Sequence, residues 1–193
     1  SICTPFFNYK ASSFFYIFHL IFDAAAPARY NKTRPHTAEG KGVITMKAVI
    51  QRVSRGKVTI DGQIHGEIGR GFVILLGVAK DDTTEDMDYL IKKISGLRIF
   101  EDTEGKMNLS LRDVDGQLLI ISQFTLFANT KKGNRPSFID AGLPEPSKAF
   151  YLDFIKAFRN LGFTVAEGEF GANMAVELVN DGPVTIIIDS KNK

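Results

Sequence analysis

A short polar segment interrupts the most apolar part of the chain, because Ser122-Gln123-Phe124-Thr125-Leu126 directly follows the run Leu118 to Ile121. On a continuing strand, alternate side chains point to the same face, so Gln123 and Thr125 would lie together. An amide beside a hydroxyl can both donate to and accept from one bound group. The segment therefore predicts a polar site on a buried strand, although the same residues could instead satisfy backbone groups at a strand end.

The sequence gives little support to metal-dependent or covalent catalysis. From residue 46 onwards the chain has one histidine, His65, and no cysteine, since Cys3 is the only cysteine of the chain. These residues form neither a clustered set of metal ligands nor a Ser-His-Asp or Cys-His arrangement, and no glycine-rich phosphate loop opens a predicted helix. We expect no metal and no cofactor, and catalysis through position and electrostatics alone.

A long polar connection over residues 128–146 follows the segment and contains Lys131, Lys132 and Arg135. Loops of this length in a compact domain are usually functional or disordered. Of 24 basic and 22 acidic residues, 19 and 20 lie in residues 46–193, so any RNA contact must be local. The loop's charge suits a phosphate backbone, but a solvated loop with incidental lysines explains the same composition.

A second motif, Asn180-Asp181-Gly182-Pro183-Val184-Thr185, precedes the last apolar run of the chain. Cis peptide bonds occur mainly before proline, and a preceding glycine removes the Cβ that would crowd a tight turn. A rigid turn can aim its carbonyl groups at a bound amine. Since most X-Pro bonds are trans, the residues alone indicate a turn at Gly182-Pro183 and no more.

The elements that position these motifs are strands and two amphipathic helices. Period-two alternation and turn signals predict strands over 48–53, 57–60, 63–68, 72–79, 98–100, 117–127, 163–170, 174–179 and 186–188. Apolar residues at helical spacing predict one helix over 83–97 and a second that Ser147 caps and Gly162 ends. The pattern predicts an α+β domain in which the helices cover a sheet.

Residues 1–45 differ from the rest of the chain. An apolar run over 13–22 lies between Lys10 and the small residues 24–28, which is typical of a secretory signal and short for a membrane-spanning helix. An organellar transit peptide, or translated sequence upstream of an initiator at Met46, fits as well. We expect 1–45 to be a leader or non-native extension with poor order. A chain that starts at Met46 would be cytoplasmic, and a genuine transit peptide would make it organellar.

The two polar motifs, with the start Met46-Lys47-Ala48-Val49-Ile50-Gln51-Arg52-Val53, closely resemble the signatures of the D-aminoacyl-tRNA deacylases. The resemblance covers essentially all of 46–193. It implies an α+β homodimer, without membrane association, of β-barrel-like subunits with antiparallel or mixed sheets and two covering helices. The implied reaction is hydrolysis of the ester that joins a D-amino acid, or mis-charged glycine, to the tRNA 3′ end, a proofreading step of translation.

The resemblance also implies roles for the second motif. In that family the Gly-Pro peptide is cis and enters the partner subunit's pocket, where its carbonyl groups face the substrate amine and its backbone excludes an L side chain. Gly182 and Pro183 would be this chirality filter, with Asn180 and Val184 beside them, and Arg52 would hold the turn.

Thr125 is the obvious nucleophile candidate, yet no base beside it is visible in the sequence. We expect Ser122, Gln123, Phe124 and Thr125 to form the catalytic wall. In this hypothesis the Gln123 side chain and backbone N–H groups around Phe124-Thr125 bind the carbonyl oxygen, while the terminal ribose 2′-hydroxyl helps water attack. Lys131, Lys132 and Arg135 would contact tRNA. A non-catalytic RNA-binding module and an ordinary esterase are the alternatives.

Overall fold

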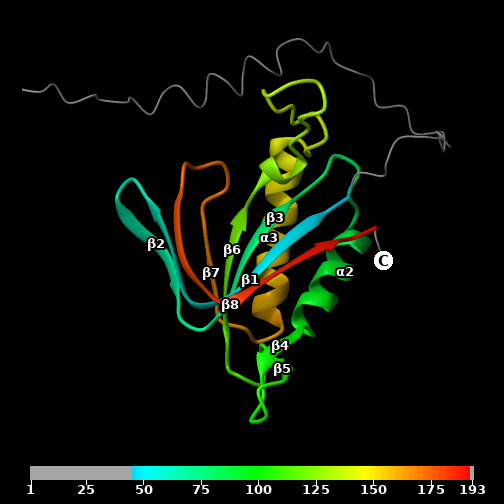
Figure 1. Cartoon of the computed structure of the whole chain (residues 1–193). Helices are drawn as coiled ribbons and strands as arrows, with labels where there is room; N and C mark the ends of the chain where they lie inside the picture. The colour runs from blue at the N-terminus through cyan, green and yellow to red at the C-terminus, as the bar shows by residue number, and fades with distance from the viewer. Residues whose placement is uncertain (1–44, 192–193) are drawn as a thin grey trace, which may run out of the picture. The chain divides into compact units, whose positions relative to one another are not determined.

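The computed structural model describes residues 45–191, so the predicted leader lies outside the described residues. The domain contains a six-stranded sheet in the order β2-β1-β3-β6-β7, with β8 also paired to β1, and a separate two-stranded sheet of β4 and β5 (Figure 1). The strands are β1 (Lys47–Ile60), β2 (Gln63–Ile68), β3 (Gly71–Gly77), β4 (Arg98–Glu101), β5 (Met107–Ser110), β6 (Gln117–Ser122), β7 (Val165–Glu167) and β8 (Ala175–Asp189).

Strand β1 connects the parts of the sheet because it pairs with three other strands. Its first half, Lys47–Val53, is antiparallel to β3, and its second half, Gly56–Ile60, is antiparallel to β2. Strand β8 runs antiparallel along the other edge of β1, from Lys47 to Thr59. Since β3-β6 and β6-β7 are parallel pairs, the sheet is mixed, as the family resemblance implies.

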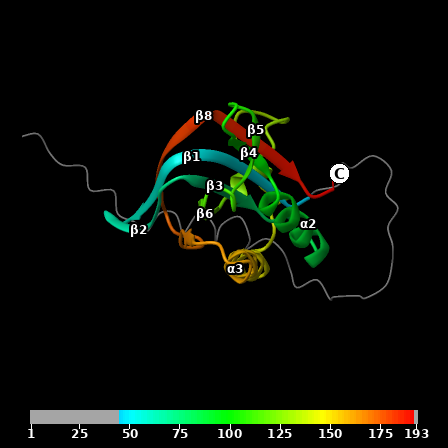
Figure 2. The same ribbon diagram turned by 90° about the horizontal axis from the view of Figure 1, so that it is seen from below.

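The sheet curls until its two ends nearly meet. A Cβ on Gly66 of β2 would lie only 2.9 Å from the carbonyl oxygen of Glu167 in β7. The glycine permits this approach because it has no side chain. The result is a nearly closed, barrel-like sheet, which Figure 2 shows from below.

The helices α2 (Thr84–Ser95) and α3 (Pro144–Asn160) cover one face of the sheet and bury the larger apolar core against it. Their core side chains meet alternate residues of the strands, such as Ile50, Ile74 and Ile120, all fully buried. The opposite face carries a smaller cluster that includes Val73 and Leu119. Along residues 45–191 no helix has the length and hydropathy needed to span a bilayer.

Several element boundaries differ from the predictions. The strand expected over 117–127 ends at Ser122, and a 3-10 helix η1 (Phe124–Phe127) follows it. Helix α3 begins at Pro144, so Ser147 lies inside it and is not its cap; proline suits the first helical position because it lacks an N–H. The predicted end at Gly162 is confirmed, since Leu161 is the C-cap and Gly162 follows with φ +86°.

Two further differences concern strands. The runs expected separately over 174–179 and 186–188 belong to one long strand, β8, whose pairing with β1 is irregular between them. Strand β5, over Met107–Ser110, was not predicted, because its residues show neither β-branched enrichment nor clear alternation. It pairs with the predicted strand β4.

Gly71 gives a direct test of the parallel β3-β6 contact. A Cβ at this position would lie 1.9 Å from the backbone oxygen of Gln117, so Gly71→Ala must push two paired strands apart. We expect a loss of roughly 3 kcal/mol or more, or about 10 °C in melting temperature, measured by thermal unfolding.

Gly96→Ala is the matched control, because its nearest neighbour would lie 3.5 Å away, at ordinary contact distance. This variant should melt within a few degrees of the unmodified protein. Equal melting temperatures for the two variants would contradict the close pairing of β3 with β6.

Candidate active site

The first half of the site is the end of strand β6 and the 3-10 helix η1. Gln123 is the residue before η1, and its N–H donates to Leu76 O at 2.7 Å. Its side-chain Nε2 donates to Thr125 Oγ1, so the predicted proximity of the two side chains is confirmed although the predicted strand geometry is wrong. Phe124 and Thr125 are exposed, and Ser122 and Gln123 are half-buried.

The 3-10 turn changes which backbone groups face outward. Leu126 N donates to Gln123 O at 3.3 Å, and Ala128 N donates to Thr125 O at 3.0 Å. The first N–H groups of a helix have no carbonyl acceptor within it, and in η1 these belong to Phe124 and Thr125. The chain therefore leaves the strand ladder after Ser122 and turns across the end of β6.

Thr125 has no visible proton acceptor of the kind that activates a nucleophile. The described hydrogen-bond partner of its hydroxyl is the Gln123 amide, which donates and cannot remove a proton. His65 lies on the exposed strand β2. The wall can position and polarise a carbonyl group, but it offers no general base of its own.

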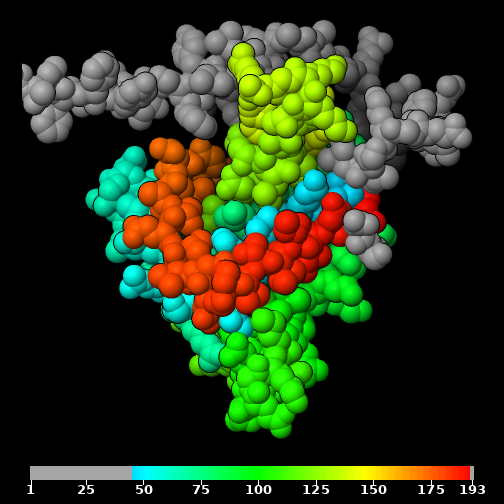
Figure 3. Space-filling view, in the orientation of Figure 1, coloured from blue at the N-terminus to red at the C-terminus, as the bar shows by residue number. Residues whose placement is uncertain are grey.

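The basic loop predicted to contact RNA lies directly after η1. The Phe138 ring packs edge-on against the Phe124 ring, with centroids 5.1 Å apart, and a bridge joins Asn129 to Ser137. These contacts hold the loop at the end of the sheet where β6 stops, where it projects in Figures 1 and 3. Its cationic side chains are all exposed: Lys131, Lys132 and Arg135.

The second motif forms a turn inside strand β8. The peptide between Gly182 and Pro183 is cis, and Gly182 has φ +133°. Asn180 spans the turn, since its Oδ1 accepts from Val184 N at 2.8 Å and its Nδ2 donates to Thr185 Oγ1 at 3.1 Å. Gly182 and Pro183 are exposed. The Asn and Thr of the motif thus hold the turn that the Gly-Pro pair makes.

The Arg52 side chain contacts this turn from inside the domain and is only 4% exposed. Its Nε donates to Asp181 O at 2.9 Å, and its Nη1 donates to Ile99 O at 2.6 Å. The carboxylates of Asp181 and Glu101 lie 3.4 and 3.9 Å from the guanidinium. Arg52 therefore contacts the turn as the resemblance implies, and it also ties the turn to strand β4.

The two halves of the site do not meet within one chain. Gln123 is bonded to Leu76 at one end of β3, whereas Arg52, which holds the turn, pairs with Phe72 near the other end. The four residue steps from Phe72 to Leu76 span about 13 Å at the usual rise of a strand. Each half is open to solvent on its own.

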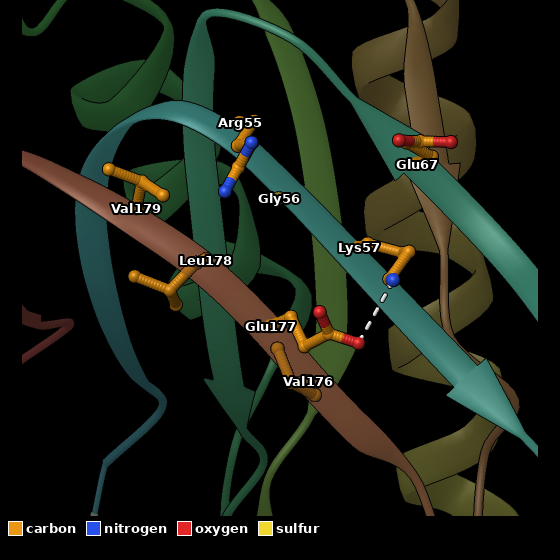
Figure 4. A pocket seen from close by; sticks show the side chains of 8 residues that line it. All are labelled: Arg55, Gly56, Lys57, Glu67, Val176, Glu177, Leu178 and Val179. Carbon is orange, nitrogen blue, oxygen red and sulfur yellow. Dashed lines mark ion pairs between the residues drawn. The ribbon is translucent and has the colours of Figure 1, made fainter.

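A groove of about 650 Å³ lies beside the turn, between strands β1, β2 and β8. Figure 4 shows Arg55, Lys57 and Glu177 around it, with Lys57 Nζ 3.0 Å from Glu177 Oε1. The register places Arg55 opposite Val179, next to Asn180. This groove was not predicted from the sequence, because its residues are ordinary strand residues that only the curl of the sheet brings together.

Comparisons with known proteins identify relatives of this chain. Residues 49–189 match the family model described as D-Tyr-tRNA(Tyr) deacylase. A D-aminoacyl-tRNA deacylase of Fusobacterium nucleatum subsp. nucleatum is 56% identical over 147 residues, which cover 76% of this chain and 97% of that protein. A D-aminoacyl-tRNA deacylase of Clostridium novyi is 55% identical over 148 residues, covering 77% and 99%.

Two solved structures are similar as well. The c-Myc DNA unwinding element binding protein has a TM-score of 0.69 and 41% identity, over 74% of this chain and 97% of its own. A probable eukaryotic D-amino acid tRNA deacylase has a TM-score of 0.63 at 18% identity, over 75% and 99%, which is a likeness of fold alone. By its family match, its close relatives and its two motifs, the chain belongs to the D-aminoacyl-tRNA deacylase family.

Proposed function

We propose that this enzyme hydrolyses the ester bond of D-aminoacyl-tRNA and releases the free D-amino acid and tRNA. The observation that carries the proposal is the 55–56% identity to D-aminoacyl-tRNA deacylases over 97–99% of their length. The geometry is compatible, since a wall with an amide donor suits an ester carbonyl and an exposed cis Gly182-Pro183 turn can offer backbone carbonyl groups to an amine. Glycyl-tRNA is a second substrate, because a filter that excludes an L side chain admits a hydrogen.

The direct test is incubation of the protein with D-Tyr-tRNA and, separately, with L-Tyr-tRNA. We expect rapid release of D-tyrosine, and release of L-tyrosine at the spontaneous rate measured without protein. Charged tRNA is quantified at intervals after acid precipitation. Binding of both tRNAs without chirally selective release would instead identify an RNA-binding module.

Catalysis in this site relies on the substrate RNA. Thr125 has no base beside it, so the terminal ribose 2′-hydroxyl assists the attacking water. The N–H groups of Phe124 and Thr125 and the amide of Gln123 bind the oxygen on which negative charge develops. The Gln123-Thr125 hydrogen bond supports this division of roles, because it fixes the amide beside those N–H groups.

Thr125→Ala separates this mechanism from nucleophilic attack by threonine. The variant should keep single-turnover deacylation of D-Tyr-tRNA within about tenfold of the unmodified rate, because the backbone donors remain. A tRNA ending in 2′-deoxyadenosine should react more than about a hundredfold more slowly with the unmodified protein. Near-complete loss of activity in a folded Thr125→Ala protein would overturn this version.

The active site is completed by a second copy of the chain. The Gly182-Pro183 turn lies too far from η1 to reach it within one chain, so a partner's turn must enter the site. The sheet face that would receive the partner is apolar and partly open. One row across it joins Leu75, Val49 and Ile187, and Ile187 is 70% exposed. A two-fold axis would place two such sites at one interface.

The basic loop then lies at the mouth of this site. Lys131, Lys132 and Arg135 extend from the segment that begins at the end of η1, so they could hold the backbone of the tRNA acceptor end. The Phe124-Phe138 contact keeps this charge close to the donors that bind the ester.

Mixing two impaired variants tests the cross-subunit arrangement. Gln123→Ala damages the wall, and Gly182→Val damages the turn, where a Cβ would lie 2.6 Å from Val184 Cγ2. Each variant alone should deacylate D-Tyr-tRNA poorly. After unfolding and refolding together, about a quarter of the unmodified activity should return, because half the dimers are mixed and each has one intact site.

The control is the same mixture without refolding, which leaves the parent species unexchanged. A monomer by sedimentation, or no recovery despite mixed dimers, would place both halves of the site in one chain.

A further inference from the structure

A buried charge cluster lies where β1 begins, apart from the residues assigned to catalysis. Asp86 of α2 is 4% exposed; its Oδ1 accepts from Ser190 Oγ at 2.9 Å, and Lys191 Nζ lies 3.8 Å from its Oδ2. Asp82 lies one turn earlier, and its Oδ2 accepts from Ala79 N at 2.6 Å. Its Oδ1 is buried and has no hydrogen-bond partner. The cluster therefore has two carboxylates and one ammonium group, and the Asp189 carboxylate lies beside it, where it accepts from Thr45 Oγ1 and Lys191 N.

The backbone nitrogen of Met46 lies at this cluster. Lys47 pairs with Gly77, so the antiparallel register places Met46 beside Val78 and next to Ala79, whose N–H Asp82 accepts. Met46 is fully buried, and its carbonyl oxygen accepts from Ser190 N at 3.0 Å. The nitrogen is thus enclosed by the same residues that surround the two carboxylates.

The surroundings of Asp82 disfavour its negative charge. Burial raises the pKa of Asp82 to about 6, and the charge of Asp86 adds to the rise, while the N–H groups of Ala79 and Met46 and the ammonium of Lys191 oppose it. Asp86, with its hydroxyl and N–H donors, has a lowered pKa. A folded-state pKa above the ordinary value means that ionised Asp82 costs stability, and this cost appears as the pH rises through about 6.

The charge of the Met46 nitrogen depends on whether a residue precedes it. In this chain Thr45 precedes Met46, so the nitrogen is a neutral amide. In a chain whose first residue is Met46 it would be an α-ammonium group. The match to the Fusobacterium protein covers 97% of that protein and 76% of this chain, and the family match begins at residue 49.

We propose that Asp82 is the counter-ion of a free α-amino group at Met46. A chain that begins at Met46, by initiation or by cleavage, thereby gains an ion pair that the longer chain lacks, and the cluster reaches two negative and two positive charges. Burial strengthens such a pair only when both partners are present. The inference concerns the start of the domain and does not depend on the proposed reaction.

The test compares the same domain before and after removal of the residues that precede Met46. A protease recognition sequence that ends at residue 45 is placed in the full chain, which is cleaved while unfolded, because Thr45 and Met46 are buried in the fold, and is then refolded with Met46 first. The uncut and cut proteins then differ in the charge on the Met46 nitrogen and in the attached segment. Acetylation of the new end removes its charge again and separates these two effects.

Asp82→Asn should lower the melting temperature at pH 7.5 by about 5 °C or more in the cut protein, where it breaks the pair. In the uncut and the acetylated proteins it should be neutral or stabilising. Asp81→Asn, at the exposed neighbouring position, should be neutral in all three. Comparison within each form cancels the loss of Thr45, whose hydroxyl donates to Asp189.

A second measurement needs no variant. In the cut protein, the pKa of the α-amino group should lie more than about one unit above its ordinary value of 7.7–8.0. This pKa is measured from the pH dependence of the group's reaction with an amine reagent. An ordinary pKa for this amine, or an equal effect of Asp82→Asn in the cut and uncut proteins, would overturn the proposal.

Discussion

The pairing of β1 on both of its edges is the constraint on which the other features depend. One edge fixes β3, and through it β6 and η1; the other edge fixes β8 and its Gly182-Pro183 turn. Because backbone ladders permit little sliding, the distance between the two halves of the site is set by register, not by flexible side chains. A backbone filter for chirality, as we propose for the Gly182-Pro183 turn, would need such rigidity, since a small displacement would admit the wrong α-substituent.

The end of β6 shows how packing overrides local pattern. Four apolar residues followed by alternating polar ones favour a strand through Phe127, yet the chain turns after Ser122. Gly77 explains the change, because η1 packs on this residue so closely that a Cβ would lie 2.9 Å from the Phe127 ring and 3.2 Å from Gln123 O. A glycine at the end of one strand thus lets the neighbouring strand become a donor-bearing turn. The donors that we propose to bind the ester are backbone N–H groups, which a search for catalytic side-chain motifs does not detect.

Much of the architecture could be predicted because it follows from period and turn chemistry. The alternation of β1, the Asp61-Gly62 hairpin and the apolar stripes of α2 and α3 identified most elements. The residues of both motifs were found, since polar groups in apolar runs and a Gly-Pro pair are conspicuous in a sequence. Three features could not be predicted from the sequence: the distance between the two motifs, the curl of the sheet that forms the groove, and the start of α3 at Pro144. These depend on long-range pairing and close approach, which local patterns do not encode.

Arg52 is a residue whose structural role could not be predicted from local sequence pattern. In the sequence it is one arginine in an alternating strand, and only resemblance suggested a role. In the fold it is a buried cation whose guanidinium joins two segments, β4 through Ile99 O and the Glu101 carboxylate, and β8 through the carbonyl and carboxylate of Asp181 beside the turn. A planar fork of donors suits this geometry, whereas lysine would offer a single point of contact. The buried guanidinium is tolerated because carbonyl and carboxylate oxygens surround it. Asp82, beside the start of β1, is the contrasting case, because its Oδ1 is buried without a hydrogen-bond partner and the counter-ion that we propose for it depends on where the chain begins.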